Sequence, residues 1–405
     1  MDIVPIHIFK LSIDRYTEKT IFTRGIAMTF LKSQVNSFAK TNPKIWIFGS
    51  ASGEMYNDNS RHFFEHIQKK QNIKAVWLTK NTEVINYLRE RGSICYHFYS
   101  PQGIYYALIS SVNVISYGYE DLPFFAYIFG RGKIIVQLWH GIPIKKIDRL
   151  RKTFLNRILR KILIMYLGRQ FDIFVTTTQK VTKIFEEAFG LEQKVFLEAG
   201  YPRMEYMISN KEKEEKLMSE RFGGKTVFFF LPTFREFDNT FQLYFGNEKK
   251  LRELDEFLGK KEYIMLVKLH LRNRNEMHME TFRELKNIIA IDCSVTYDLY
   301  SELAGADVLV TDFSGVAYEF AMLGKPIIFV EFREDKYLSK ERDVYFLPRE
   351  VCGGNYAQSW NEFMILIQEK NWKNLDFRDF CTKYIGTKFD GSCDCIERAI
   401  SNKIL

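Results

Sequence analysis

The chain has 405 residues, of which 46% are hydrophobic and 27% are charged, and its formal net charge is +8. This composition excludes an intrinsically disordered chain, and the length predicts two folded domains. The positive charge favours an anionic partner, namely nucleic acid, an acidic bilayer or a phosphorylated substrate.

The opening segment MDIVPIHIFKLSIDRY has no basic leader ahead of an apolar core, so it does not predict a signal peptide. The sequence has no run of about 20 apolar residues, the length that a membrane-spanning helix needs. The six cysteines lack zinc-site spacing and are interpreted as reduced thiols. We therefore expect the protein on the cytosolic side of a membrane.

Apolar runs and helical patterns alternate through the first half of the chain. Helical spacing of apolar residues occurs at 60–71 and 81–91. Strands that alternate with helices predict a parallel, doubly wound sheet. The runs expected to form its strands are 44–50, 73–79, 112–118, 133–139 and 171–177.

A charged stretch at 209–225 interrupts this pattern, which then restarts. The later strands are expected at 226–232, 263–269, 306–312 and 325–331. We predict an α/β protein with two Rossmann-like domains that face one cleft. The expected units are 1–210, 211–385 and a C-terminal helix within 386–405 that packs back on the first domain.

The stretch VTDFSGVAYEFAMLGKPIIF is typical of a phosphate-binding turn. A strand ends at Asp312, and Ser314 and Gly315 open a helix whose free N–H groups and dipole suit a pyrophosphate. Glu319, one turn later, can reach a ribose. The alternative is an ordinary N-cap with a packing glycine. The pattern favours binding of a nucleotide donor.

Two further polar groups follow expected strands. Thr233 and Arg235 in FLPTFRE can contact phosphate or a nucleobase, although a surface salt bridge explains the arginine equally well. Gly200, Pro202 and Arg203 in EAGYPRMEY by themselves predict only a turn that leads out of the first domain.

His140 and His270 each close an apolar strand, in IIVQLWH and IMLVKLH. A partly desolvated imidazole titrates near neutral pH and suits general acid–base catalysis. A single such histidine is usually structural, but two that face one cleft favour catalysis. No histidine cluster has the spacing of metal ligands, so we predict no metal site. The histidines interpreted as structural are His7, His62, His66, His97 and His278.

The segment after His140, KKIDRLRKTFLNRILRKILIMYLGR, holds nine Lys or Arg against one Asp. Its apolar residues recur every three or four positions, which predicts a basic amphipathic helix in a membrane interface. The alternative is a core-packed helix with a solvated basic face. No nucleic-acid-binding signature accompanies the charge, so we expect no nucleic-acid partner. The predicted membrane contacts are Lys145, Lys146, Arg149, Phe154, Arg157, Ile158, Lys161, Ile162 and Met165.

Several ordered motifs resemble one family. They are FGSASGEMYNDNSRHFFEHI, QLWHGIPIKKI, GYPR, LPTFRE, KLH and TDFSGVAYEFAMLGKPIIF, and they span roughly 50–350. In this order they resemble the CDP-glycerol:glycerophosphotransferases, which include teichoic-acid primases and polymerases and related capsule polymerases. The resemblance implies a GT-B-like fold, with an N-terminal acceptor domain, a C-terminal nucleotide domain and peripheral attachment to the cytoplasmic face of a bacterial membrane.

The resemblance also implies roles for individual residues. His140 would deprotonate the acceptor hydroxyl, and His270 would steady the donor pyrophosphate. Thr233, Arg235, Ser314 and Gly315 would hold the nucleotide and its phosphates, with support from Asp312 and Glu319. The cleft wall would include Gly141, Pro202 and Arg203.

The chain departs from the family pattern in three places. Ser314–Gly315 replaces the usual pair of serines, LRNRN after His270 is more basic, and 331–357 keeps only the outline of the donor-side loop. These differences leave the identity of the transferred alditol open.

The expected reaction is transfer of glycerol phosphate, or a related polyol phosphate, from a CDP-activated donor to a lipid-linked acceptor hydroxyl, with release of CMP. The expected partners are the CDP-alditol, the acceptor lipid and an anionic inner leaflet. No cofactor is predicted, and a requirement for Mg²⁺ stays open. The alternatives are a GT-B glycosyltransferase or sugar-nucleotide epimerase, and a non-catalytic membrane-bound scaffold.

Overall fold

The structure is a computed structural model. It describes residues 40–128, 132–143, 147, 171–233, 240–268, 279–291, 294–332, 345, 355–372, 381–386 and 390–404. Arg235, His270 and, apart from Ile147, the predicted basic helix over 145–169 lie outside these ranges.

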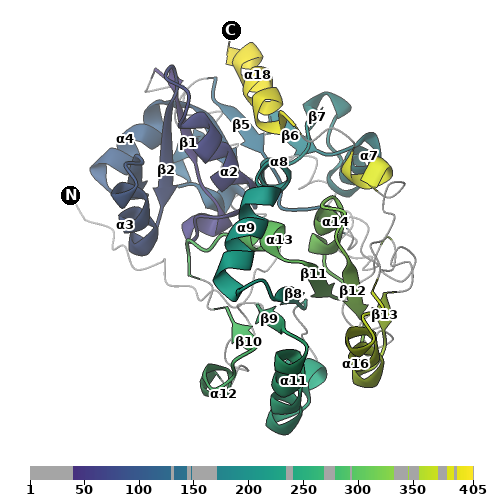
Figure 1. The fold of residues 1–405 in the computed structure, drawn as a ribbon. Coiled ribbons are helices and arrows are strands. Elements are labelled where there is room, and N and C mark those ends of the chain that lie inside the picture. Colours follow the sequence, from purple (N-terminus) through teal and green to yellow (C-terminus); the bar gives the residue numbers. More distant parts are fainter. Residues whose placement is uncertain are drawn as a thin grey trace, which may run out of the picture.

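The first half of the chain forms a seven-stranded parallel sheet with the order β3-β2-β1-β4-β5-β6-β7 (Figure 1). Its central strands are apolar along most of their length because helices cover both faces of a parallel sheet. The strands are β1 Asn42–Phe48, β2 Lys74–Thr79, β3 Cys95–His97, β4 Ser110–Ile115, β5 Ile134–Gln137, β6 Ile173–Thr176 and β7 Phe196–Glu198.

The second half forms a six-stranded parallel sheet with the order β10-β9-β8-β11-β12-β13. Figure 1 shows it below the first sheet, with α8 and α13 between the two. The strands are β8 Thr226–Leu231, β9 Tyr263–Val267, β10 Ile288–Ala290, β11 Val308–Thr311, β12 Ile327–Val330 and β13 Tyr356–Ala357.

Each strand predicted from the sequence is present, with shifted ends. The sequence did not predict β3, β7, β10 and β13, which are the outermost strands of the two sheets. Each of these has only two or three residues, too few for an apolar run to be recognised. These edge strands are therefore defined by backbone pairing with the neighbouring strand and not by a local sequence pattern.

The helices predicted at 60–71 and 81–91 are α2 and α3. Among the described residues, no helix is both long and apolar enough to cross a bilayer. The helices are α2 Asp58–Ile67, α3 Thr82–Glu90, α4 Pro101–Ile109, α5 Phe125–Ile128, α7 Gln179–Phe189, α8 Pro202–Ser209, α9 Lys211–Phe222, α10 Thr240–Phe245, α11 Glu248–Lys260, α12 Met279–Arg283, α13 Leu299–Gly305, α14 Val316–Ala321, α16 Trp360–Gln368 and α18 Ser392–Ile404. Short 3₁₀ turns occur at Ala51–Gly53, Tyr119–Asp121 and Gln193–Val195, and a π-helical turn at Cys381–Ile385.

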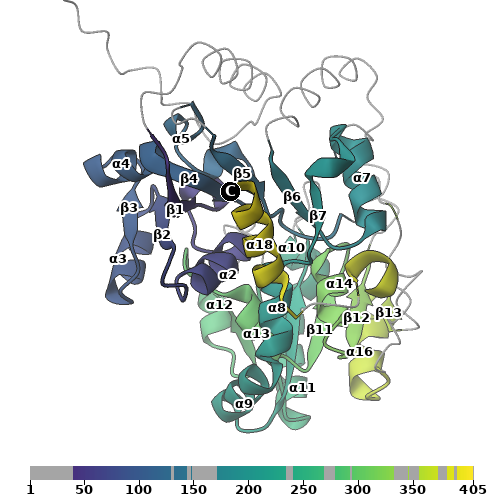
Figure 2. The same cartoon turned by 90° about the horizontal axis from the view of Figure 1, so that it is seen from above.

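The C-terminal helix α18 lies beside α2 and α8 (Figure 2). Ile396 and Ile400 of α18 are buried in one apolar cluster with Phe63 and Phe64 of α2. The backbone N–H of Cys393 donates a hydrogen bond to the carboxylate of Glu205 in α8, at 2.8 Å. The end of the chain thus completes the core beneath the first sheet, next to the helix that carries Arg203.

Gly49, in the FGSASG motif, packs directly against the backbone of Asp121. A Cβ atom at Gly49 would lie 1.9 Å from the carbonyl oxygen of Asp121. We expect Gly49→Ala to lower the free energy of unfolding by about 1–3 kcal/mol, the usual cost of overpacking. Urea unfolding followed by circular dichroism measures this change.

Gly118→Ala in the same loop region is the control, because its Cβ would approach only the flexible end of Glu120. Equal urea midpoints for the two variants would contradict the predicted clash.

Candidate active site

One cavity of about 500 Å³ lies where the two sheets face each other. Strand order reverses between β1 and β4 in the first sheet and between β8 and β11 in the second. In open parallel sheets, ligands bind beyond the carboxyl ends of strands at such switch points. The cavity is lined by Met55, Asn57, Asp58, Tyr117, His140, Gly141, Ile142, Ile147, Arg203, Thr233, Lys268, Tyr297, Asp298, Leu299, Tyr300, Ser314, Gly315, Val316 and Glu319.

His140 follows β5, and the backbone around it is strained. The φ angle of Trp139 is 60° and that of Gly141 is 135°, so the residues on both sides adopt positive φ. Such a conformation is rare for a bulky residue like tryptophan and persists only where tertiary contacts hold it. Strain of this kind concentrates at functional sites, which agrees with the predicted role of His140.

The imidazole of His140 is held between two aromatic rings. Its centroid lies 4.3 Å from that of Trp139 and 4.7 Å from that of Tyr117, and the latter ring is nearly parallel to it, at 6°. The Nδ1 atom lies 3.1 Å from the carbonyl oxygen of Ser116. Because a carbonyl only accepts, Nδ1 carries the proton, which leaves Nε2 as the basic nitrogen.

A buried ion-pair network lies beside His140. Nη1 of Arg203 is 2.6 Å from Oδ1 of Asp58, and Nη2 of Arg203 pairs with Oε1 of Glu319. These residues belong to α8, α2 and α14, so the network joins elements of both sheets. We call Asp58, Arg203 and Glu319 the Arg203 bridge. Burial works against the charge of Arg203, but the two carboxylates outweigh it and raise the pKa of the guanidinium, which stays protonated.

The carboxylate of Asp312 accepts hydrogen bonds from the backbone N–H of Thr233 at 2.8 Å, the Thr233 hydroxyl at 2.9 Å and the Tyr244 hydroxyl at 2.5 Å. Asp312 is fully buried and does not line the cavity, whereas Thr233 does. The carboxylate of Asp312 therefore contributes to the cavity by holding Thr233 in place at its wall.

Ser314 and Gly315 open α14 at the cavity wall. A Cβ atom at Gly315 would lie 3.1 Å from the carbonyl oxygen of Ile142. This contact is tighter than most side chains make, so the loop after His140 leaves little room for a side chain at this position.

Residues 31–385 match the sequence profile of the family described as CDP-Glycerol:Poly(glycerophosphate) glycerophosphotransferase. The chain belongs to this family. The resemblance that the ordered motifs predicted is confirmed, and with it the assignment of the chain as a glycerophosphotransferase-type enzyme.

A curated relative of this glycerophosphotransferase is the teichoic acid poly(glycerol phosphate) polymerase of Bacillus spizizenii. The two are 28% identical over 366 residues, which cover 82% of this chain and 85% of that protein. The solved structure of the wall teichoic acid polymerase TagF superposes with a TM-score of 0.74 at 19% identity, over 96% of this chain and 98% of that one.

The UDP-GlcNAc 2-epimerase of Neisseria meningitidis bound to UDP-GlcNAc superposes with a TM-score of 0.52 at 12% identity, over 88% of this chain and 99% of that one. Together with the two parallel sheets, these neighbours confirm the predicted α/β, GT-B-like fold.

The structure brings together most of the predicted site residues that it describes. His140, Gly141, Arg203, Thr233, Ser314, Gly315 and Glu319 line the cavity of the glycerophosphotransferase. Pro202 is buried at the first turn of α8, next to Arg203. The carboxylate of Glu319 contacts Arg203, and its contact with a ribose stays a prediction.

The sequence-based prediction missed several cavity residues. Asp58 lies inside the first family motif, Tyr117 ends an expected strand and Lys268 opens the KLH motif. Asp58 and Tyr117 follow β1 and β4, the two strands at the switch point of the first sheet, and Lys268 directly follows β9, so a position beyond the carboxyl end of a strand was the available signal. Nothing local in the sequence showed that Asp58 and Arg203 would pair across 145 residues.

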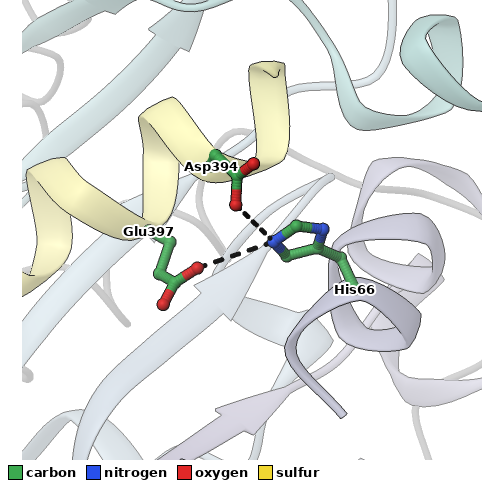
Figure 3. A group of neighbouring side chains, drawn as sticks. All are labelled: His66, Asp394 and Glu397. Carbon is green, nitrogen blue, oxygen red and sulfur yellow. Dashed lines mark ion pairs between the residues drawn. The ribbon is translucent and has the colours of Figure 1, made fainter. Parts of the chain in front are cut away.

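Away from the cavity, His66 of α2 lies beside Asp394 and Glu397 of α18, with ligand-type atoms within 4.8 Å of one another (Figure 3). Nε2 of His66 is 3.2 Å from Asp394 and 3.5 Å from Glu397. Nζ of Lys70 is 3.0 Å and 2.8 Å from the same carboxylates. Because this ammonium lies between the two carboxylates and offsets part of their charge, we interpret the cluster as ion pairs that hold α18 on α2.

His140 should titrate below the ordinary histidine value of 6.5, because burial lowers the pKa of its imidazole, while the charge of Asp58 partly offsets this effect. A lowered pKa means that the folded state favours neutral His140, so its contribution to stability is present above pH 6.5 and is lost as pH falls through the lowered value. Histidine NMR titration measures the midpoint.

Asp58→Asn should move this midpoint further down, since it removes the charge that favours the imidazolium. A midpoint at or above 6.5 in the unmodified protein, assigned by its absence in His140→Gln, would contradict the buried setting of His140.

Proposed function

We propose that the enzyme transfers glycerol phosphate, or a related polyol phosphate, from a CDP-activated donor to an acceptor hydroxyl and releases CMP. The observation that carries this proposal is the His140 imidazole. Its Nδ1 is committed to Ser116, so its basic Nε2 is available in a cavity whose opposite wall holds Thr233, Ser314 and Gly315.

In the proposed reaction, Nε2 of His140 accepts the proton of the acceptor hydroxyl while the acceptor oxygen attacks the distal phosphorus of the donor. A bond forms between that oxygen and the distal phosphorus, and the bond from this phosphorus to the bridging oxygen breaks. The bridging oxygen keeps the electron pair and leaves with CMP. Such phosphoryl transfer depends mostly on positioning and charge stabilisation, so it requires few catalytic groups.

The charge that develops on the leaving phosphate requires donors on the second sheet. We assign Thr233, Ser314 and the backbone at Gly315 to the donor phosphates, with Arg235 and His270 in the roles that the family resemblance implies. Lys268 follows β9 and lines the same wall, so its ammonium adds a cation to this group.

The acceptor is proposed to be lipid-linked and the enzyme to work at the cytoplasmic face of the bacterial membrane. The basic segment over 145–169 follows His140 closely in the sequence, and Ile147 from this segment lines the cavity. A cavity next to a membrane-bound segment would receive its acceptor directly from the bilayer.

The test of the reaction is nucleotide release from CDP-glycerol, CDP-ribitol and UDP-sugars in the presence of acceptor-bearing liposomes. We expect CMP from a CDP-alditol, and a loss in turnover of about 10²–10⁴-fold in His140→Gln, the usual contribution of a general base. UDP release would identify a nucleotide-sugar enzyme, and the absence of release with every donor would favour a scaffold.

His97→Gln is the matched control for this loss. His97 lies in the edge strand β3, and its Nδ1 only accepts a hydrogen bond from the backbone of Tyr99 at 3.2 Å. Turnover should stay within about twofold of the unmodified enzyme, because surface substitutions away from a site have small effects.

Binding to anionic vesicles tests the membrane proposal. Changing Arg149, Arg157 and Lys161 together to Gln should weaken binding roughly a hundredfold, since each cation near the surface contributes about 1 kcal/mol. Sedimentation with phosphatidylserine-containing vesicles measures this change, and the difference should shrink as salt rises.

The control replaces Lys213, Lys216 and Lys249, which are solvent-exposed cations of α9 and α11, by Gln. Equal loss of binding in the two triple variants would show that net charge alone, and not the predicted helix, attracts the enzyme to the vesicles.

A further inference from the structure

The Arg203 bridge spans the cavity from one sheet to the other. Asp58 opens α2, which follows β1, and Glu319 lies in α14, which follows β11. Arg203 in α8 contacts one carboxylate with each of its terminal nitrogens. All three side chains are buried, so the ion pairs are shielded from water and the planar guanidinium sets the spacing of the two carboxylates.

The backbone next to His140 rests on this bridge. A Cβ atom at Gly141 would lie 2.9 Å from Nη2 of Arg203 and 3.3 Å from Oε1 of Glu319. The positive φ of Gly141, 135°, also disfavours any other residue. The loop that carries the imidazole therefore lies directly against the ion pair between Arg203 and Glu319.

A second connection holds the other side of the loop. The side-chain amide of Asn59 donates a hydrogen bond to the carbonyl of Trp139 at 2.9 Å. The amide oxygen of Asn59 accepts from the backbone N–H of Arg203 at 3.2 Å. Both residues that flank His140 are thus fixed to α2 and α8, where the bridge is anchored.

A third connection reaches the imidazole itself. The hydroxyl of Tyr117 donates to Oδ2 of Asp58 at 2.9 Å, and the ring of Tyr117 stacks on His140. Asp58 adopts a φ of 63°, which is uncommon for a residue other than glycine. The plane of the imidazole is therefore set by a ring that the bridge holds in place.

We propose that the Arg203 bridge is a positioning device, which fixes His140 relative to the donor half of the cavity so that base, acceptor hydroxyl and donor phosphorus meet at one distance. This rests on the proposed function, in which His140 is the base. Asp58, Arg203 and Glu319 act through His140 and are positioning residues. A buried ion pair is often no more stabilising than apolar side chains of similar size, so stability alone does not explain the bridge.

Arg203→Lys tests the proposal, because lysine keeps the charge but cannot hold both carboxylates in a planar fork. We expect turnover to fall at least about tenfold, since a misplacement of about 1 Å can cost a hundredfold, while KM for the CDP-alditol stays within about twofold. The matched control is Arg252→Lys. Arg252 lies in α11 and forms an exposed ion pair with Glu284 at 2.6 Å, and neither residue lines the cavity.

Tyr117→Phe is the second variant and covers the case in which Arg203→Lys does not fold. It keeps the stacked ring and removes only the hydrogen bond to Asp58. We expect a fall in turnover of about tenfold or more, without a change in the donor KM, because a hydrogen bond to a charged group such as the Asp58 carboxylate is worth about 1.5–3 kcal/mol. A turnover equal to that of Arg252→Lys, or a loss seen only in KM, would overturn the positioning role.

The chemical shifts of His140 provide a readout that does not depend on turnover. Its ring protons feel the ring currents of Tyr117 and Trp139, so they should move in Arg203→Lys and not in Arg252→Lys. If the His140 shifts move in Arg203→Lys but the unmodified enzyme releases no CMP, the proposed function is wrong and the positioning role of the bridge is retained. Normal CMP release with unchanged turnover and shifts in Arg203→Lys would reject the bridge and keep the function.

Discussion

The buried guanidinium of Arg203 connects the two halves of this enzyme through ion pairs with a carboxylate from each half. Arg203 is 3% exposed and has carboxylates of Asp58 and Glu319 on its two terminal nitrogens. An uncompensated charge at this depth would be strongly destabilising, so both carboxylates must be present, and they come from helices of different sheets. The loop around His140 lies against this pairing at Gly141.

The two sheets provide the frame for that pairing. The carboxyl ends of parallel strands lie at one edge of a sheet. At that edge, a crevice forms where the strand order reverses, and this occurs in both sheets. On the side of the first sheet the cavity holds His140 between two aromatic rings. On the side of the second sheet it holds Thr233, Lys268 and Ser314. In the proposed reaction, acceptor chemistry and donor binding belong to separate sheets, which must face each other at a fixed distance.

The sequence predicted the fold, the family and part of the cavity lining, because buried parallel strands are continuous apolar runs and the motifs occur in order. It did not predict the edge strands, since two or three residues carry no recognisable pattern. It assigned Arg203 to the cleft wall only through the family resemblance and did not find Asp58. The partnership of these two residues depends on tertiary packing across 145 positions, which no local periodicity records.

In the proposed reaction, the distal phosphorus of the donor is transferred and CMP leaves. Phosphorus NMR of the products formed from CDP-glycerol and an acceptor tests it most directly, because the spectrum reports which bond breaks. We predict that both pyrophosphate signals disappear and that a phosphomonoester and a phosphodiester signal appear in equal amounts. Pyrophosphate signals retained in released CDP would mean that the bond to carbon breaks, and would contradict the proposed transfer of the distal phosphorus.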